Sequence, residues 1–213
     1  MCSHVRMRSW SVVVPAKRLA HAKTRLRALT AAGGHEELVL ALLGDTVAAA
    51  IGCADVAEVV VVTDDPAAAS VVRELGARTV ADEPDRGLNP ALEHGARSAT
   101  AEAVAALSSD LPALRPEELA AALEAAGAVP RAFVADSPGT GTTLLTAVGT
   151  ALRPRFGPGS AAAHAADGAV ALTGTWPGLV RDVDTAEDLS AALALGVGPR
   201  TARALAGHPG AAR

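Results

Sequence analysis

The chain has 213 residues, which is enough for a sizeable hydrophobic core in one domain. Half of the residues are apolar, but there are only two Trp, two Phe and no Tyr, so Ala, Val and Leu must build a core of helices packed on a buried parallel sheet. The formal net charge of −4 argues against a protein that binds nucleic acid through a broad basic surface, so any cationic site must be local.

Short β-branched runs alternate along the chain with longer segments rich in Ala and Leu. The expected strands are Trp10–Val14, Glu58–Thr63, Arg78–Ala81, Ala103–Leu107, Ala132–Ala135, Thr143–Ala147, Ala169–Thr173 and Leu179–Asp182. The expected helices are His35–Ile51, Pro66–Leu75, Leu88–Ala99, Pro116–Ala126, Ser160–Ala166 and Thr185–Leu195. This alternation predicts right-handed crossovers and an α/β, Rossmann-like, mostly parallel sheet with helices on both faces.

The pattern changes after residue 130, where strands become shorter and turns contain more Gly and Pro. We interpret this part as a small antiparallel or mixed insertion at one edge of the sheet. No linker or internal repeat interrupts the chain, so we expect a single domain over residues 9–197. Residues 1–8 and 198–213 are expected to be flexible tails.

The sequence also favours a soluble, cytoplasmic protein. No segment reaches the roughly 18 apolar residues of a membrane span, and residues 1–8 lack the apolar region and cleavage site of a signal peptide. Cys2 and Cys53 have no metal-binding spacing and make no disulfide framework, which fits a reducing compartment.

The first expected strand leads into a cationic segment. In WSVVVPAKRLAHAKTRL, residues 10–26, Lys17, Arg18, Lys23 and Arg25 follow the strand and Pro15. A polar strand end of this kind is typical of a nucleotide-binding fold, yet no glycine-rich phosphate loop follows it. The residues alone leave the ligand of this strand end open.

Acidic residues follow other expected strands, and open α/β sheets bind ligands at the carboxyl ends of their strands. Asp110, in SSDLPAL, is either a turn residue or a metal ligand. Asp182 and Asp184, in RDVDTAEDL, are two apart on an extended segment, so their side chains leave the same face. Two carboxylates this close repel unless a cation lies between them, which favours Mg²⁺. The alternative is that Asp184 only caps the following helix.

Two further strand ends carry polar candidates. Asp65, directly before Pro66, is expected to be a helix N-cap. Of the two acids, Asp64 is therefore the better candidate to face the ligand cleft at the strand ends. Asn89, in GLNPAL, has an amide suited to a base or ribose edge, although an ordinary N-cap would use it equally well. The six histidines lack metal-binding spacing, and neither Cys53 nor Ser109 has a nearby base that would make it a nucleophile.

Two loops of small residues are candidates for binding an anion. They are DSPGTGTTLL, residues 136–145, and RFGPGSAAAH, residues 155–164. Gly lets backbone N–H groups approach a phosphate, Thr and Ser add hydroxyl donors, and a helix start at Ser160 presents its positive end. Turn chemistry alone would also produce such loops, but Arg153 and Arg155 favour the anion site.

Taken together, these motifs resemble one family. The segments VVVPAKRLAHAKTRL, VVTDDPA, GLNPAL, SSDLPAL, GTGTTLL, FGPGSAAAH and RDVDTAEDL occur in the order seen in the 2-phospho-L-lactate and phosphoenolpyruvate guanylyltransferases of coenzyme F-420 biosynthesis. These enzymes are relatives of the molybdenum-cofactor guanylyltransferases and of sugar-phosphate nucleotidyltransferases. The resemblance runs from about residue 10 to 195. It implies a fold like that of the nucleotide-diphospho-sugar transferases.

The resemblance also implies a reaction and its residues. GMP from GTP would be joined to the phosphate of phosphoenolpyruvate or 2-phospho-L-lactate, with Mg²⁺ as cofactor and pyrophosphate as product. The catalytic residues would be Lys17, Lys23 and Asp110; the nucleotide-binding residues Lys17, Lys23 and Asn89; the metal ligands Asp110, Asp182 and Asp184; and the acceptor-binding residues Thr142, Gly157 and Ser160. The expected partners are GTP, a three-carbon phospho-acid (phosphoenolpyruvate above all) and the downstream deazaflavin transferase, without nucleic acid or membrane.

Three other functions remain open from the sequence. Another nucleotidyltransferase, of the molybdenum-cofactor or sugar-phosphate type, would share the fold. A metal-dependent glycosyltransferase would use an Asp-x-Asp motif, but that motif ends a mid-chain strand, whereas residues 182–184 lie near the end of the expected domain. A non-catalytic nucleotide-binding module would have little use for three acids converging on one cleft.

Overall fold

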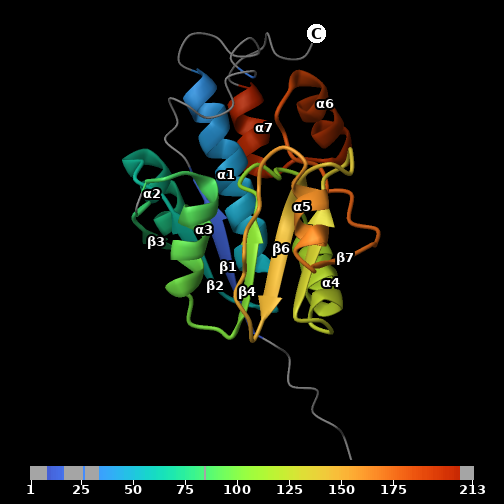
Figure 1. The fold of residues 1–213 in the computed structure, drawn as a ribbon. Helices are drawn as coiled ribbons and strands as arrows, with labels where there is room; N and C mark the ends of the chain where they lie inside the picture. The colour runs from blue at the N-terminus through green and yellow to red at the C-terminus, as the bar shows by residue number, and fades with distance from the viewer. Residues whose placement is uncertain (1–8, 17–25, 27–33, 84, 207–213) are drawn as a thin grey trace, which may run out of the picture.

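The computed structural model describes residues 9–16, 26, 34–83 and 85–206. Within these residues one seven-stranded sheet has the order β3-β2-β1-β4-β6-β5-β7 (Figure 1). The strands are β1 Trp10–Pro15, β2 Val56–Val62, β3 Arg78–Val80, β4 Ala103–Leu107, β5 Arg131–Ala135, β6 Thr142–Val148 and β7 Val170–Ala171. The helices are α1 Gly34–Gly52, α2 Pro66–Glu74, α3 Leu88–Arg97, α4 Pro116–Ala126, α5 Ser160–Ala166, α6 Ala186–Leu195 and α7 Pro199–Ala206.

The central strand β1 pairs in parallel with both β2 and β4, and β3 continues the parallel part beyond β2. Strand β6 runs antiparallel to its two neighbours, β4 and β5, and β7 pairs in parallel with β5. The mixed part of the sheet therefore begins after residue 130, as the shorter strands and Gly/Pro-rich turns predicted. The mostly parallel α/β sheet is confirmed.

Alternation along β1 divides the core into two layers. Val12 and Val14 pack with α1, α2 and α4 on one face, whereas Val13 packs with α3 and α5 on the other. All three valines are fully buried, as expected of a strand covered by helices on both faces. A third apolar cluster joins α1 to α6 and α7, at the end of the molecule toward which β1 and β4 point (Figure 1).

The C-terminal segment corrects one prediction. Residues 199–206 form α7, which packs against α1, where we expected a flexible tail from residue 198. The carboxylate of Asp45 on α1 is 5% exposed and accepts the backbone N–H groups of Arg200 at 3.1 Å and Thr201 at 2.8 Å. This carboxylate satisfies donors that the first turn of a helix cannot pair internally, so α7 begins against α1. The other expected tail residues, 1–8 and 207–213, lie outside the described residues.

The expected strand Leu179–Asp182 is also wrong. The backbone N–H groups of Leu179 and Val180 both donate to the carbonyl of Trp176, at 3.0 and 3.2 Å, so these residues complete a turn. Pro177 and Gly178 favour that turn over a continuing strand. Residues 179–182 look like a strand because they include apolar residues such as Leu179, which is buried in the core without pairing in the sheet.

We expect replacement of Asp45 with Ala to lower the free energy of unfolding by about 2–3 kcal/mol, because it leaves two N–H donors at the start of α7 without their acceptor. Asp45→Asn should lose less, since one acceptor oxygen remains. Urea denaturation would measure both changes. Glu36→Ala, which removes an exposed acid from the first turn of α1, is the matched control and should change stability by about 0.5 kcal/mol or less. A D45A protein as stable as the control variant would show that α7 contributes little to the fold.

Candidate active site

Asp110 is held in place by α1. It follows β4 and is 8% exposed, and the next residue, Leu111, donates its backbone N–H to the Oγ1 of Thr46 at 2.9 Å. The Thr46 hydroxyl in turn donates to the carbonyl of Leu42 at 2.8 Å. Both of its hydrogen-bonding functions are used inside the protein, so Thr46 positions the turn that carries the acid.

The segment carrying the other two acids lies directly beside this turn. The backbone N–H of Val183 donates to the carbonyl oxygen of Asp110 at 3.1 Å. Val183 is fully buried, whereas Asp182 is half-buried and Asp184 is exposed. This alternation agrees with the prediction that the two acids leave the face opposite to the intervening residue.

The structure does not assemble the three acids into a three-carboxylate metal centre. Across the described part of the chain, no group of three Asp, Glu, His or Cys side chains is arranged to hold an ion. The alternative that Asp184 caps the last predicted helix is not what the structure shows either. The N-cap of α6 is Thr185, whose hydroxyl accepts the N–H of Asp188 at 3.2 Å, in a capping box.

Of the predicted nucleotide-binding residues, Lys17 and Lys23 lie outside the described residues. Asp65 is the N-cap of α2, accepting the N–H groups of Ala67 and Ala68 at 2.9 and 3.0 Å, as predicted. Asp64 is exposed and accepts the N–H of Asp82 at 3.1 Å, which ties the end of β2 to the segment after β3.

Asn89 uses its amide to hold another loop. Its Nδ2 donates to the carbonyl of Phe156 at 3.1 Å, and its Oδ1 accepts the N–H of Phe156 at 2.8 Å. The N-cap position of α3 belongs to Gly87, so the capping interpretation of Asn89 is wrong. The side chain joins the start of α3 to the loop before α5, and a nucleotide contact stays a prediction.

The two small-residue loops lie next to each other. The carboxylate of Asp136 accepts the N–H groups of Thr140 and Gly141 at 2.9 and 2.8 Å, which closes the first loop. The carbonyl of Thr140 accepts the N–H of Ala161 at 3.1 Å, which joins this loop to the first turn of α5. A side chain at Gly141 would collide with Asp136, so the loop requires a residue without Cβ there.

The three residues predicted to bind the acceptor substrate, Thr142, Gly157 and Ser160, lie on the two loops that meet here. Thr142 and Ser160 are 7% and 2% exposed. Gly157 has φ +134°, a conformation that residues with a side chain rarely adopt. Their role in binding the acceptor stays a prediction, and the structure adds that both hydroxyl-bearing residues are buried.

His164 connects these pieces and was not predicted. It is 1% exposed; its Nδ1 lies 2.9 Å from the Oγ1 of Thr142, and its Nε2 accepts the N–H of Arg155 at 2.8 Å. Burial lowers the pKa of His164 to about 4, so the ring is neutral at physiological pH. A signal was available in the sequence, because Ser160 and His164 are four apart and share one face of a helix.

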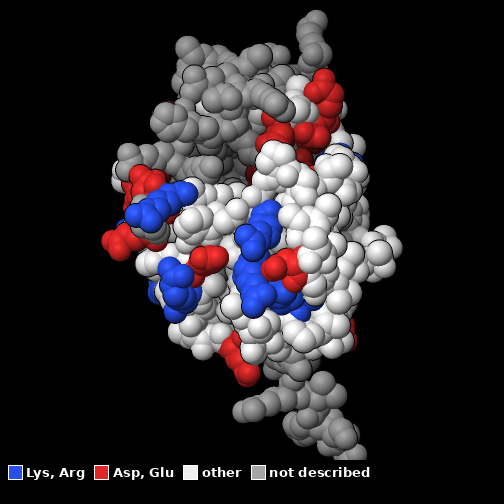
Figure 2. Space-filling view, viewed as in Figure 1, with Lys and Arg blue, Asp and Glu red and all other residues white. Residues whose placement is uncertain are grey.

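Basic side chains surround the outer side of this junction. Arg153 and Arg155 are exposed on the loop before α5, and Arg131 forms an ion pair with Asp167 at 2.6 Å. The hydrogen bond from Arg131 holds the pKa of Asp167 below its usual value. Figure 2 shows basic side chains gathered around an acidic one in the middle of this face.

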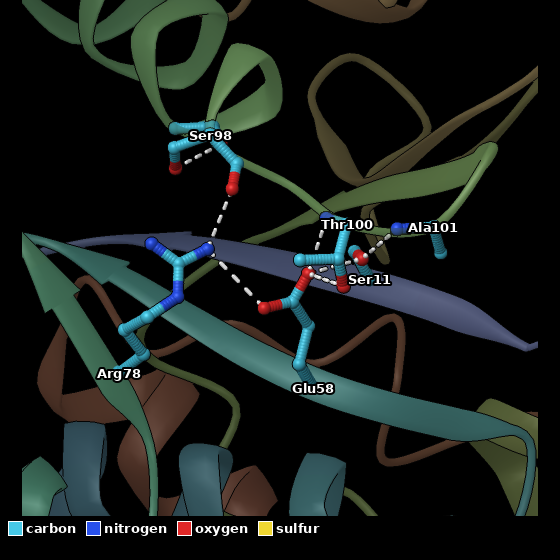
Figure 3. A network of polar contacts seen from close by, with 7 residues as sticks. Ser11, Glu58, Arg78, Ser98, Thr100 and Ala101 are labelled. Carbon is cyan, nitrogen blue, oxygen red and sulfur yellow. Dashed lines mark hydrogen bonds and ion pairs between the residues drawn. The ribbon is translucent and has the colours of Figure 1, made fainter.

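A second polar network lies at the opposite edge of the sheet and is structural (Figure 3). The carboxylate of Glu58 accepts the hydroxyl of Ser11 at 2.6 Å, the N–H of Thr100 at 2.6 Å and the guanidinium of Arg78 at 3.2 Å. Burial raises the pKa of Glu58, but the hydrogen bonds outweigh it and lower the pKa to about 2. The network joins β1, β2 and β3 to the segment that precedes β4.

These two groups predict how stability depends on pH. The pKa of His164 falls from 6.5 to about 4 on folding, so between these values the unfolded chain binds more protons and stability decreases as pH falls. Glu58 also has a lowered pKa, so its contribution is lost between about pH 4.5 and 2.

Urea denaturation should show a loss of about 2–3 kcal/mol from His164 as the pH falls from 7 to 4. His164→Asn, which does not titrate in this range, should remove most of that decrease. An equal decrease in wild type and variant would show that other groups cause it.

The same fold occurs in two solved structures. A nucleotidyl transferase from Methanothermobacter thermautotroptrophicus superposes with a TM-score of 0.60 over 86% of this chain and 94% of that chain, at 19% identity. A protein from Desulfovibrio desulfuricans G20, assigned as a nucleotide-diphospho-sugar transferase, superposes with a TM-score of 0.65 over 84% of each chain, at 16% identity. At such identities the likeness establishes the fold.

Sequence relatives define the family within this fold. The family described as "Guanylyl transferase CofC like" matches residues 10–205. A phosphoenolpyruvate guanylyltransferase of Geodermatophilus obscurus is 69% identical over 208 residues, which cover 95% of this chain and 97% of the relative. One of Salinispora arenicola is 59% identical over 91% of this chain and 92% of the relative. This chain belongs to the CofC-like guanylyl transferase family. None of its described helices is long and apolar enough to cross a bilayer.

Proposed function

We propose that the protein joins GMP from GTP to the phosphate of phosphoenolpyruvate and releases pyrophosphate. The observation that carries this proposal is the 69% identity over 95% of the chain with a relative named for this activity. The junction of the two small-residue loops supports it, because a compact polar site suits a three-carbon phospho-acid better than a pterin or a sugar, which need stacking or many hydroxyl contacts.

The reaction mainly requires the alignment of two polyanions, GTP and phosphoenolpyruvate. A phosphate oxygen of the acceptor attacks the α-phosphorus of GTP, and pyrophosphate leaves in line. Phosphate is already a nucleophile, so no covalent enzyme intermediate is required. The protein must hold both substrates in the reacting geometry and stabilise the charge that develops toward pyrophosphate.

Each group of residues has a part in this alignment. Thr142, Gly157 and Ser160 would bind the acceptor through hydroxyl and backbone N–H groups. Lys17 and Lys23 would replace the N–H cradle of a glycine-rich loop with positive charge around the triphosphate. Asn89 would contact the nucleotide through the hydrogen-bonding positions that its two contacts with Phe156 leave open.

Asp110, Asp182 and Asp184 fit a magnesium site in which the protein supplies only one or two of the ligands. The backbone hydrogen bond between Val183 and Asp110 brings two segments with carboxylates side by side. Mg²⁺ takes one or two carboxylates and completes its shell with water and substrate phosphates, so three converging carboxylates are not needed. Asp110 with Asp182 or Asp184 would hold the ion, which when bound neutralises charge on the phosphates.

Release of pyrophosphate from GTP tests the reaction directly. Purified protein with Mg²⁺ should release pyrophosphate fastest with phosphoenolpyruvate and more slowly or not at all with 2-phospho-L-lactate and 3-phosphoglycerate. EDTA should abolish the release, and excess Mg²⁺ should restore it. Equal release without any acceptor, or cleavage of a nucleotide-sugar in place of GTP, would overturn the proposal.

The setting of the reaction follows from its substrates and product. GTP and phosphoenolpyruvate are cytoplasmic metabolites, so we place the reaction in the cytoplasm. The product carries an activated phospho-acid, which the resemblance assigns to coenzyme F-420 biosynthesis, where a deazaflavin transferase would consume it.

A further inference from the structure

His164 occupies the centre of the junction between the two small-residue loops. It lies on α5, almost completely buried, with the rings of Phe133 and Phe156 at centroid distances of 5.9 and 5.2 Å. These rings exclude water from the imidazole and fix its plane. The two ring nitrogens are then left to the two polar groups that face them.

The hydrogen bonds of the ring determine its tautomer. The backbone N–H of Arg155 can only donate, so the Nε2 that it contacts at 2.8 Å must be the acceptor. In a neutral ring the proton is therefore on Nδ1, which donates to the Oγ1 of Thr142 at 2.9 Å. The low pKa of His164 agrees with a neutral ring. Burial is its main cause; the negative charge of Asp167 acts to raise the pKa, and the positive charges of Arg131 and Arg155 act to lower it.

This tautomer has a consequence for Thr142. Its hydroxyl oxygen already accepts the proton of His164, so the hydroxyl hydrogen is directed elsewhere. A hydroxyl fixed in this way is a donor in a defined direction, as an anionic oxygen requires. The same ring also holds the loop that leads through Phe156 to Gly157, since Arg155 is bound to its other nitrogen.

We infer that His164 is a positioning residue of the acceptor site: it orients the Thr142 hydroxyl as a donor to the phospho-acid and holds the 153–157 loop so that Gly157 meets the same ligand. The inference rests on the proposed function, because the acceptor is assigned to Thr142, Gly157 and Ser160. His164 does not itself contact the acceptor. It acts through the two groups that it holds.

Three variants separate the two hydrogen bonds. His164→Gln keeps an acceptor near the Nε2 position for the N–H of Arg155, and His164→Asn keeps a donor near the Nδ1 position for Thr142. His164→Leu removes both while filling a similar apolar volume. We expect an acceptor KM raised by about tenfold or more in the Leu variant and by smaller factors in the other two, with the KM for GTP and kcat within about threefold of wild type.

Thr146→Val is the matched control for a loss of stability alone. Thr146 is on β6, four residues beyond Thr142, is 1% exposed, and donates its hydroxyl to the carbonyl of Ala132 at 3.1 Å. Its replacement also deletes a buried hydrogen bond in this strand, away from the loops. We expect T146V to lower the midpoint of urea unfolding and to leave the acceptor KM unchanged.

The assay is pyrophosphate release at varied phosphoenolpyruvate and saturating GTP, after wild type has shown acceptor-dependent release. An acceptor KM in H164L within about twofold of wild type, or an equal rise in the KM for GTP, would overturn the positioning role while leaving the proposed function intact. Wild type without acceptor-dependent release would overturn the proposed function and this inference together. If H164L does not fold, unchanged acceptor KM values in both H164N and H164Q would reject the positioning role.

Discussion

Replacement of Asp110 with Asn is expected to lower kcat by about 100-fold or more, with little change in the free energy of unfolding. Asn has nearly the same shape, but its neutral amide is a weak ligand for Mg²⁺ and leaves the charge of the phosphates uncompensated. The backbone contacts of the turn, Leu111 to Thr46 and Val183 to Asp110, do not depend on the carboxylate. Pyrophosphate release at saturating substrates and urea unfolding would measure the two quantities.

Glu124→Gln is the control for this prediction. Glu124 is an exposed acid near the end of α4, and Gln keeps the size of its side chain. We expect its kcat within about threefold of wild type. If D110N also stays within about tenfold of wild type, Asp110 does not bind the metal.

A second large effect is expected at Gly157, where Ala should raise the acceptor KM by about tenfold. Nothing lies within 4 Å of the place that a Cβ would occupy, so the substitution causes no steric collision. It does penalise the φ of +134°, which the loop would relieve by moving its backbone N–H groups away from the acceptor. The KM for GTP and the fold should change little.

The control for Gly157→Ala is a second glycine with positive φ, in a turn outside the two small-residue loops. Gly76, in the turn between α2 and β3, has φ +101°, and a Cβ added there would also meet nothing within 4 Å. Gly76→Ala should therefore cost a similar amount of stability, about 1–2 kcal/mol, and leave both KM values unchanged. If the two variants behaved alike in the kinetic assay, the loop would have no special part in binding the acceptor.

Much of the fold was predictable because local patterns and tertiary structure agree. The helices Pro116–Ala126 and Ser160–Ala166 begin and end where predicted, because a Pro marks the first turn of one and a Gly-rich turn precedes Ser160 in the other. Strand Ala103–Leu107 was equally clear, since it is a short apolar run between turns. The failures at 179–182 and 198–206 have a different origin, because contacts with the rest of the fold decide the structure of both segments.

The candidate site shows the same division. Asp110, Thr142 and Ser160 could be proposed from their place at the ends of strands and loops. The contacts of Asn89 with Phe156 and of His164 with Thr142 and Arg155 could not, because they join residues that are far apart in the chain or belong to different elements. Residue type alone does not tell whether an amide or an imidazole faces a substrate or the backbone.

Two adjacent residues of α1 link α7 to the turn that carries Asp110. Asp45 receives the start of α7, and Thr46 receives the N–H of Leu111. The N–H of Gly198 also donates to the carbonyl of Pro112 at 2.8 Å. Truncation before residue 198 would therefore loosen the support of Asp110 as well as remove a helix. For the design of shortened or tagged versions, the C-terminal cut belongs no earlier than after Ala206.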